Sequence, residues 1–317
     1  MSQLPSTRPM SAGMGVLTIL MTLVGWSSIP LFLRYFSEHI DPWTSNGWRY
    51  GASALFWSPV LIAAALCGRW PAGLWRAALV PGSINVCGQI CFVWAHYQIE
   101  PGLLTFGLRS QILFAAVGAF LLFPQERAVI RTPSYLFGAL LVVMGTSGSI
   151  LLSPQSIDWT RLSGVGLAIA SGGLFACYAL SVRKYMPGVH SVMAFAAISQ
   201  LTAAVMVGLM FVLGERFGAD AWDLSREQFV WLLLSALIGI ALGHVFYYMS
   251  IARLGVAVSA GVLQLQPFLV AVASYLLFGE VLRVGQWLSG GLAVCGALLM
   301  LAVQLRLSQL QRLADGR

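Results

Sequence analysis

The sequence carries little charge. Only 9% of its 317 residues are Asp, Glu, Lys or Arg, 58% are hydrophobic, and the mean hydropathy is +0.82. A soluble domain has about 25% charged residues, so a water-solvated surface is excluded. Apolar runs of about 20 residues, the length that crosses a bilayer, recur along the chain. The composition therefore predicts an all-α, multi-pass membrane protein.

Acidic residues are absent from the interior of every expected span. All eleven lie in loops or at span ends, as Glu100 and Glu126 do, and the only lysine is Lys184. Exporters of lipophilic cations commonly rely on a carboxylate inside the membrane. A chain without one is better suited to a substrate that itself carries a carboxylate. This absence also disfavours proton coupling through acids, which leaves facilitated diffusion or a histidine relay.

Motifs for enzymatic chemistry and metal binding are missing as well. No GxxxxGK[ST], HExxH or GxSxG occurs, so we expect no enzyme and no cofactor. The five cysteines form no CxxC and lie in apolar segments, which predicts neither disulfides nor a metal site. The net charge of +7 is scattered over loops, which is typical of cytoplasmic loops and not of nucleic-acid binding.

Charged and turn residues divide the chain into ten expected spans. A first repeat at 13–152 and a second at 164–305 flank a linker at 153–163, and a basic tail follows at 306–317. No small-residue cleavage site follows the first apolar run, which is therefore predicted to remain as a span. The expected spans are 13–34, 47–67, 77–99, 102–123, 134–152, 164–184, 190–213, 228–250, 256–278 and 285–305.

The two halves repeat one pattern at a constant distance. Gly88, Leu108, Gln111 and Leu121-Leu122-Phe123 recur 155 positions later, as Gly243, Leu263, Gln266 and Leu276-Leu277-Phe278. A duplicated hydrophobic unit is the usual architecture of a secondary transporter. Because each unit crosses the membrane five times, the two must be inverted relative to each other.

The distribution of basic residues predicts the orientation. With both termini in the cytoplasm, that side receives about twice as many Arg and Lys residues as the opposite side. The longest hydrophilic connection, 214–227, then faces outward with Trp222 near the lipid headgroups. We expect a solvated loop there, without chemistry.

Five segments of the chain form a recognisable set: Gly25-Trp26-Ser27-Ser28, Trp48-Arg49-Tyr50, Ala252-Arg253-Leu254-Gly255, Gln266-Pro267 and Leu276-Leu277-Phe278-Gly279-Glu280. Together they resemble the drug/metabolite transporter superfamily, in its ten-helix EamA-type branch. The resemblance covers nearly the whole chain, although Ile112 and Pro124-Gln125-Glu126 depart from the second-half pattern. It implies two inverted five-helix repeats that export small metabolites through a central cavity. Among members of the superfamily, the chain looks most like bacterial exporters of aromatic amino acids.

Arg109 is the basic residue expected deepest in a span. It lies about seven residues into the fourth span, roughly 10 Å below the membrane edge at 1.5 Å per residue, with Thr105 one turn away. A central arginine costs about 2.5 to 3.5 kcal/mol, so it needs water, a partner or a ligand. Either it binds a substrate carboxylate, or it extends outward or bonds to helix carbonyls.

A polar stripe follows the third expected span. Asn85, Gln89, Phe92 and His96 recur at helical spacing. Such a stripe must face protein or a cavity, so these residues either line a cavity or hydrogen-bond between helices. His96 lies near the outer mouth, where simple hydration would also explain it.

The second repeat supplies the matching candidates. His244 and Tyr248, one turn apart in the eighth span, form a partner stripe, and His244 corresponds to Gln89; it is either a proton relay or, more often in such cases, a packing residue. Gln264 corresponds to Arg109. The equivalent Gln111 and Gln266 are predicted to approach each other at the midplane, around a ligand or as a clasp between helices.

Aromatic residues in the spans predict the walls of the cavity. Trp26 and Tyr178 occupy roughly corresponding positions in the first and sixth spans, and together with Tyr248 they would contact an apolar side chain. We therefore expect a bacterial inner-membrane exporter of small amphipathic metabolites, above all aromatic or hydrophobic amino acids. It would work by alternating access, as a monomer surrounded by lipid. An exchanger of phosphorylated anions, a passive channel and a lipid-modifying enzyme are the alternatives.

Overall fold

The computed structural model describes residues 12–124, 127–152, 159–254, 259 and 262–315, and every regular element in this part of the chain is helical. Nine helical segments there are long and apolar enough to span a membrane, and Gln266–Phe278 is a shorter apolar one. The predicted all-α membrane fold is confirmed. The elements are α1 (Ala12–Phe36), α2 (Pro42–Leu66), α3 (Leu74–His96), α4 (Pro101–Leu108), α5 (Gln111–Leu122), α6 (Arg127–Ile130), α7 (Pro133–Leu151), α8 (Trp159–Tyr185), α9 (Ser191–Leu213), η2 (Glu215–Asp223), α10 (Arg226–Ser235), η3 (Ala236–Leu242), α11 (Gly243–Leu254), α13 (Gln266–Phe278) and α14 (Val284–Asp315).

The helices begin or end at other residues than predicted in several places. α8 begins at Trp159, so 159–163 of the predicted linker is helical, while 153–158 lies outside the described residues. α14 continues to Asp315, so most of the predicted tail extends the last helix. The predicted start of the ninth span, 256–258, also lies outside the described residues.

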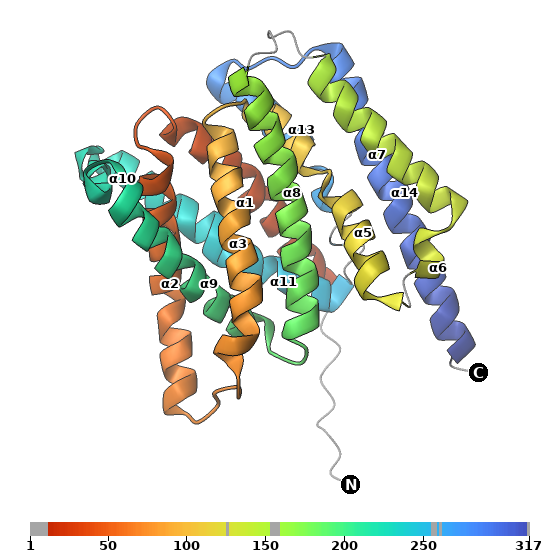
Figure 1. Ribbon diagram of the computed structural model, residues 1–317, viewed down its shortest axis with the longest axis horizontal. Helices are drawn as coiled ribbons and strands as arrows, with labels where there is room; N and C mark the ends of the chain where they lie inside the picture. Colours follow the sequence, from red (N-terminus) through yellow and green to blue (C-terminus); the bar gives the residue numbers. More distant parts are fainter. Residues whose placement is uncertain (1–11, 125–126, 153–158, 255–258, 260–261, 316–317) are drawn as a thin grey trace.

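The helices pack as two related sets. α7 packs along α14 and α2 along α9, and each of these pairs joins equivalent helices of the two repeats. The contact of α3 with α8, seen at the centre of Figure 1, is matched by the contact of α1 with α11. α1 begins and α14 ends in the lower half of Figure 1. The same neighbours therefore recur in both repeats, as inverted repeats require.

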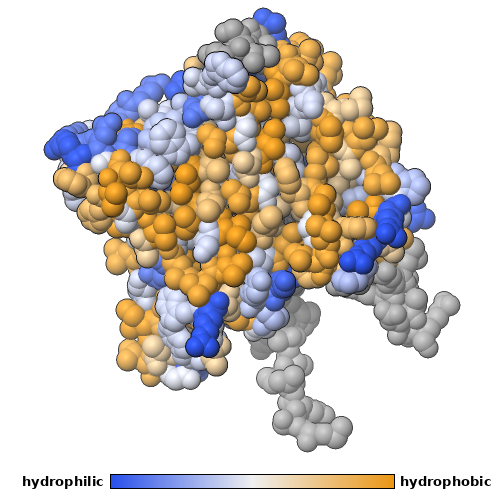
Figure 2. Space-filling model, viewed as in Figure 1, coloured by the Kyte–Doolittle hydropathy of each residue, from blue (hydrophilic) through white to orange (hydrophobic). Residues whose placement is uncertain are grey.

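The surface of the bundle is apolar around its middle. Figure 2 shows hydrophobic residues across the centre of one face, with hydrophilic residues at the upper left and along the lower margin. Large side chains such as Leu55, Val212 and Leu276 are at least 74% exposed. In a membrane these side chains contact lipid tails, which removes them from water.

Glycines bring the backbones of α7 and α14 into contact. A Cβ atom built on Gly296 would lie 2.5 Å from the carbonyl oxygen of Gly138, and one built on Gly145 would lie 2.3 Å from the Ala293 nitrogen. Small residues permit such close approach between membrane helices, where van der Waals packing drives association.

Gly296→Ala is therefore expected to lower the thermal stability of the detergent-solubilised protein. Inserting an extra methyl group into a well-packed contact costs about 1 to 3 kcal/mol. The matched control is Gly291→Ala on the same helix, because a Cβ there has nothing within 4 Å. Thermal unfolding followed by tryptophan fluorescence measures both variants, and equal midpoints would contradict the proposed role of this contact.

Candidate functional site

Two spans are interrupted at equivalent positions. The fourth span breaks between α4 and α5, at Arg109 and Ser110, and a turn at Gln264 and Leu265 precedes α13 in the ninth. These pairs are separated by the same 155 positions as the rest of the repeat. Discontinuous helices near the midplane are the positions where transporters bind their substrates and ions.

Arg109 crosses from one interrupted span to the other. It is 8% exposed, and its Nη1 donates to the carbonyl oxygen of Leu263 at 3.2 Å. The residue that would normally donate to this carbonyl is Pro267, which has no N–H. The Nη2 of Arg109 donates to Gln266 Oε1 at 2.9 Å. The sequence left three roles open for Arg109: binding a substrate carboxylate, extending outward, or bonding to a helix carbonyl. The structure shows the bond to a helix carbonyl.

Gln266 extends this contact to the first helix. Its Nε2 donates to the carbonyl oxygen of Trp26 at 2.8 Å. The usual donor to that carbonyl would be Pro30, which again lacks an N–H. The side chains of Arg109 and Gln266 thus donate to the two backbone carbonyls that lack a helical hydrogen bond because of Pro267 and Pro30. In doing so they join α1, α4 and the ninth span. We call these two residues the clasp.

No hydrogen bond joins Gln111 to Gln266 in the described part of the chain, although the sequence predicted that the two would approach each other. Gln111 is half-buried at the start of α5, and its side chain forms no hydrogen bond within the described part of the chain. Arg109 takes the place beside Gln266 instead, because its longer side chain reaches across the break. Gln264 is 6% exposed, so it is buried beside the turn as its position suggested.

An aromatic group surrounds Trp26. Its indole ring lies 5.2 Å from the ring of His244 and 5.0 Å from that of Tyr247, and its Nε1 donates to the Gly239 carbonyl at 3.1 Å. Gly239 belongs to η3, a π-helical stretch inside the eighth span. Such stretches often occur at functional sites. Gly243 makes room for the indole, because a Cβ there would lie 2.6 Å from Nε1.

The same arrangement recurs in the other repeat around Phe175. A Cβ on Gly88 would lie 2.8 Å from this ring, and Phe92 lies 5.8 Å from it between ring centres. Gly88 and Phe92 correspond to Gly243 and Tyr247. The structural counterpart of Trp26 is therefore Phe175, one helical turn before the Tyr178 that the sequence comparison suggested.

Tyr178 still lies in the interior, with a different partner. Its hydroxyl group is 3.1 Å from that of Tyr248, and the Tyr248 ring is 6.3 Å from Tyr247. His244 stacks on Phe195 at 4.7 Å, and its Nδ1 is 3.0 Å from the Ile240 carbonyl oxygen. These contacts favour packing over proton relay for His244. Arg109, Gln266, Trp26, His244, Tyr248 and Tyr178 thus lie in one connected region.

The α3 stripe faces other helices. Asn85 donates to Thr202 Oγ1 at 3.0 Å, and the backbone carbonyl of Gln89 accepts from Asn46 at 3.4 Å. The Gln89 side chain is half-buried. His96 is only 2% exposed and bonds through Nδ1 to the Phe92 carbonyl at 2.8 Å, so the interpretation of simple hydration is wrong.

Arg49 is a buried residue that the sequence argument left outside the site. It is 2% exposed, and its Nε donates to Ser235 Oγ at 2.9 Å. α2 begins at Pro42, capped by the Asp41 carboxylate, and not at 47 as predicted. Arg49 therefore lies seven residues inside the helix, roughly 10 Å from its start.

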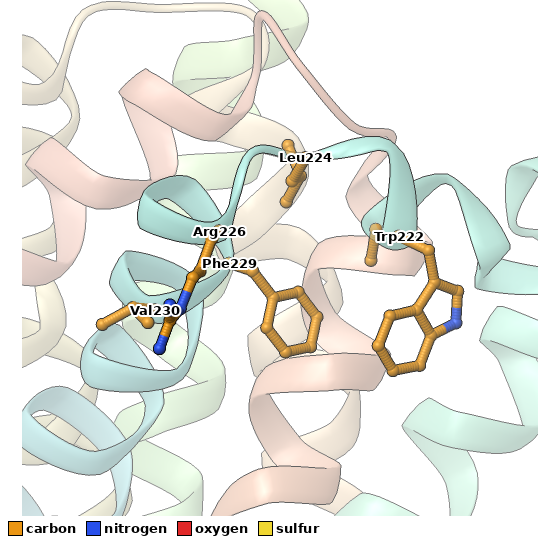
Figure 3. Close-up of a pocket in the computed structure, with 6 residues that line it drawn as sticks. Trp222, Leu224, Arg226, Phe229 and Val230 are labelled. Carbon is orange, nitrogen blue, oxygen red and sulfur yellow. The ribbon is translucent and has the colours of Figure 1, made fainter.

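The pocket in Figure 3 lies between the 214–225 connection and the start of α10, and not in this interior. Its volume is about 450 Å³, and the Trp222 and Phe229 rings within it stack at 5.2 Å. In the same loop, a hydrogen bond with Asp220 and the charge of Asp41 raise the pKa of Glu215. The residues that line the pocket are Ala221, Trp222, Leu224, Arg226, Phe229 and Val230. None of them is a predicted site residue.

The comparisons with known proteins agree with this fold. The model of the EamA-like transporter family matches twice, over residues 13–151 and 162–302. The protein is therefore a multi-pass membrane transporter with two EamA repeats, and not an enzyme. It belongs to the EamA-like transporter family, within the drug/metabolite transporter superfamily.

Other comparisons add only the fold. A crystal structure described simply as that of a protein matches with a TM-score of 0.63 and 17% sequence identity. The match covers 94% of this chain and 99% of that one. No curated protein matches the sequence.

Proposed function

We propose that the protein exports small amphipathic metabolites, with aromatic and other hydrophobic amino acids as substrates. The observation that carries this proposal is the pair of buried arginines, Arg49 and Arg109. Neither forms an ion pair with a carboxylate anywhere in the described ranges. Because opposite charges attract strongly at low dielectric, this interior favours a substrate that brings its own carboxylate.

The surroundings of the arginines favour an apolar or aromatic side chain. Trp26, Tyr178, Tyr248 and His244 supply aromatic surface next to the clasp. The fourth and ninth spans are interrupted at equivalent positions of the two repeats. We propose that the repeats alternate around them. The substrate-binding residues proposed are Trp26, Asn85, Gln89, His96, Arg109, Gln111, Tyr178, His244, Tyr248, Gln264 and Gln266.

The cellular setting is part of the same proposal. The excess of basic residues on one side supports cytoplasmic termini in a bacterial inner (plasma) membrane. The repeats at 13–152 and 164–305 enclose the proposed site within one chain, so we propose a functional monomer. Substrates would then leave the cytoplasm through the outward face.

Arg49 also favours a second candidate, the exchange of phosphorylated anions. This function requires more buried positive charge than Arg109 alone, and Arg49 supplies a second buried cation. A phosphate group takes bidentate hydrogen bonds from arginine as well as a carboxylate does. The aromatic surface around Trp26 contributes nothing to phosphate binding, so amino acid export remains the first proposal.

Counterflow in proteoliposomes distinguishes these functions. Unlabelled phenylalanine inside the vesicles is expected to raise the uptake of labelled phenylalanine at least about fivefold, because a carrier exchanges faster than it returns empty. A sugar phosphate or a lipophilic cation inside should not. Acceleration by the sugar phosphate alone would favour the anion exchanger, and uptake that never saturates would favour a channel. Repeating the assay with a pH gradient tests proton coupling.

A further inference from the structure

Arg49 has binding capacity that the protein itself leaves unused. Only its Nε has a hydrogen-bond partner among the described residues, and Nη2 is fully buried without one. Arg109, by contrast, uses both of its terminal nitrogens in the clasp. A buried guanidinium without a counter-charge costs several kcal/mol, so this arrangement is stable only if something else satisfies it.

Two buried acceptor atoms near Arg49 are also without partners. Asn46 is 1% exposed, and its Oδ1 has no hydrogen bond in the described part of the chain. Asn46 precedes Arg49 by three positions on α2, so the two side chains lie on one face, with about 5 to 6 Å between their Cβ atoms. His96 Nε2 is the second atom without a partner. His96 follows Gln89 by seven positions on one face of α3, the face where the Gln89 carbonyl accepts a hydrogen bond from Asn46.

The types of these atoms identify the group that they fit. The proton of His96 lies on Nδ1, because Nδ1 is 2.8 Å from the Phe92 carbonyl oxygen. Nε2 therefore accepts hydrogen bonds, as Asn46 Oδ1 does. The site thus offers charged donors from Arg49 beside two neutral acceptors. An α-amino acid carries the complementary groups, a carboxylate next to an ammonium.

We propose that Arg49 binds the substrate carboxylate, and that Asn46 and His96 accept hydrogen bonds from its ammonium group. This inference rests on the proposed function, because it assumes an amino acid as the substrate. This assignment moves the substrate carboxylate from Arg109 to Arg49, because both terminal nitrogens of Arg109 already have partners. Arg109 then acts as the positioning residue that joins the interrupted spans. A phosphorylated anion would satisfy Arg49 but has no ammonium group to donate to the two acceptors.

Three probes separate the two halves of this group: phenylalanine, phenethylamine without the carboxylate, and 3-phenylpropionate without the ammonium. Equilibrium binding to the purified full chain is expected to be at least tenfold tighter for phenylalanine than for either analogue. In Arg49→Gln, the preference for phenylalanine over phenethylamine should fall at least tenfold. In Asn46→Val, the preference for phenylalanine over 3-phenylpropionate should fall instead.

The selectivity ratios and the stability together exclude a merely structural role. A packing defect would weaken all three probes alike and leave their ratios unchanged. Arg49→Gln removes an uncompensated buried charge, so its thermal midpoint is expected to equal or exceed that of the wild type. Asn46→Val gives an independent result if Arg49→Gln fails to fold.

The outcomes distinguish this inference from the proposed function. If the wild type binds phenylalanine and both variants keep its ratios, the assignment to Arg49 and Asn46 is overturned while amino acid transport stands. If the wild type binds 3-phenylpropionate as tightly as phenylalanine, the ammonium assignment is overturned. If the wild type binds none of the probes and shows no phenylalanine counterflow, the proposed function itself is overturned.

Discussion

Gln266→Leu is expected to destabilise the protein by about 3 kcal/mol and to abolish transport. Gln266 gives the buried Arg109 an acceptor at 2.9 Å and holds the Trp26 carbonyl at 2.8 Å. Removing it leaves a charged donor and a carbonyl without partners in the interior, and the charged donor is the costlier of the two. Thermal unfolding in detergent and counterflow in proteoliposomes measure the two effects.

A second substitution tests the reason for this loss. Arg109→Leu in the Gln266→Leu background removes the orphaned charge, so the double variant should be more stable than Gln266→Leu alone. Transport should stay absent, because the interrupted spans are no longer joined. Gln111→Leu is the matched control: it changes the equivalent residue of the first repeat, which makes no such bonds, and should shift the midpoint little. An additive double variant would contradict the clasp.

The sequence predicted where the clasp lies but not how it is built. Apolar length located the spans, and the 155-residue repeat paired Arg109 with Gln264 and Gln111 with Gln266. The two carbonyls that the clasp uses are released by Pro30 and Pro267, which sequence shows directly. Which side chain reaches them depends on the crossing of α1, α4 and the ninth span. That crossing is set by packing and has no local sequence signal.

Arg49 was missed for a more tractable reason. Placing the start of the second span at 47 put this arginine at the membrane edge. Asp41-Pro42 is a strong signal for a helix start, since Asp caps the first turn and Pro fits the first helical position. Applying that rule would have placed Arg49 two turns deep, where an arginine is a candidate for function.

The π-helical stretch in the eighth span had no such signal. Its sequence, Ala236 to Leu242, is apolar and ordinary for a membrane helix. Two tryptophans from other helices donate to its carbonyls, Trp26 to Gly239 and Trp57 to Ala241, at 3.1 and 3.2 Å. Those partners lie more than 180 positions away along the chain. A long-range contact of this kind cannot be inferred from one sequence alone.

The clasp joins α1 to α13 at mid-depth, and an ion pair at one membrane face joins α1 to Glu280, two residues beyond the end of α13. Arg34 Nε is 2.9 Å from Glu280 Oε1, and the guanidinium lies 6.0 Å from the Phe278 ring centre. The contact between arginine and phenylalanine recurs at the other face, where Arg183 lies 4.0 Å from the Phe123 ring centre. Arg183 follows Arg34 by 149 positions in the sequence, and Phe175 follows Trp26 by the same number. Arg34 and Arg183 therefore occupy equivalent positions in the two repeats, and each contacts the equivalent phenylalanine of a neighbouring span.

Charge reversal at Glu280 is expected to open the Arg34 face. In Glu280→Arg two cations meet where the native side chains are 31% and 17% exposed, so the ends of α1 and α13 separate and counterflow falls at least tenfold. The swap Arg34→Glu with Glu280→Arg should recover part of the activity. Spin labels at His39 and Val281, in a chain with its five cysteines replaced by serine, report the separation as a longer distance.

Glu38→Arg is the matched control for this experiment, because Glu38 bonds the same Arg34 at 2.9 Å but is 64% exposed. An exposed pair four residues apart on a helix contributes only about 0.3 to 0.5 kcal/mol, so neither distance nor transport should change much. Equal losses in Glu38→Arg and Glu280→Arg would mean that added charge alone slows transport. Unchanged distances in Glu280→Arg would mean that the ion pair does not hold α1 to α13.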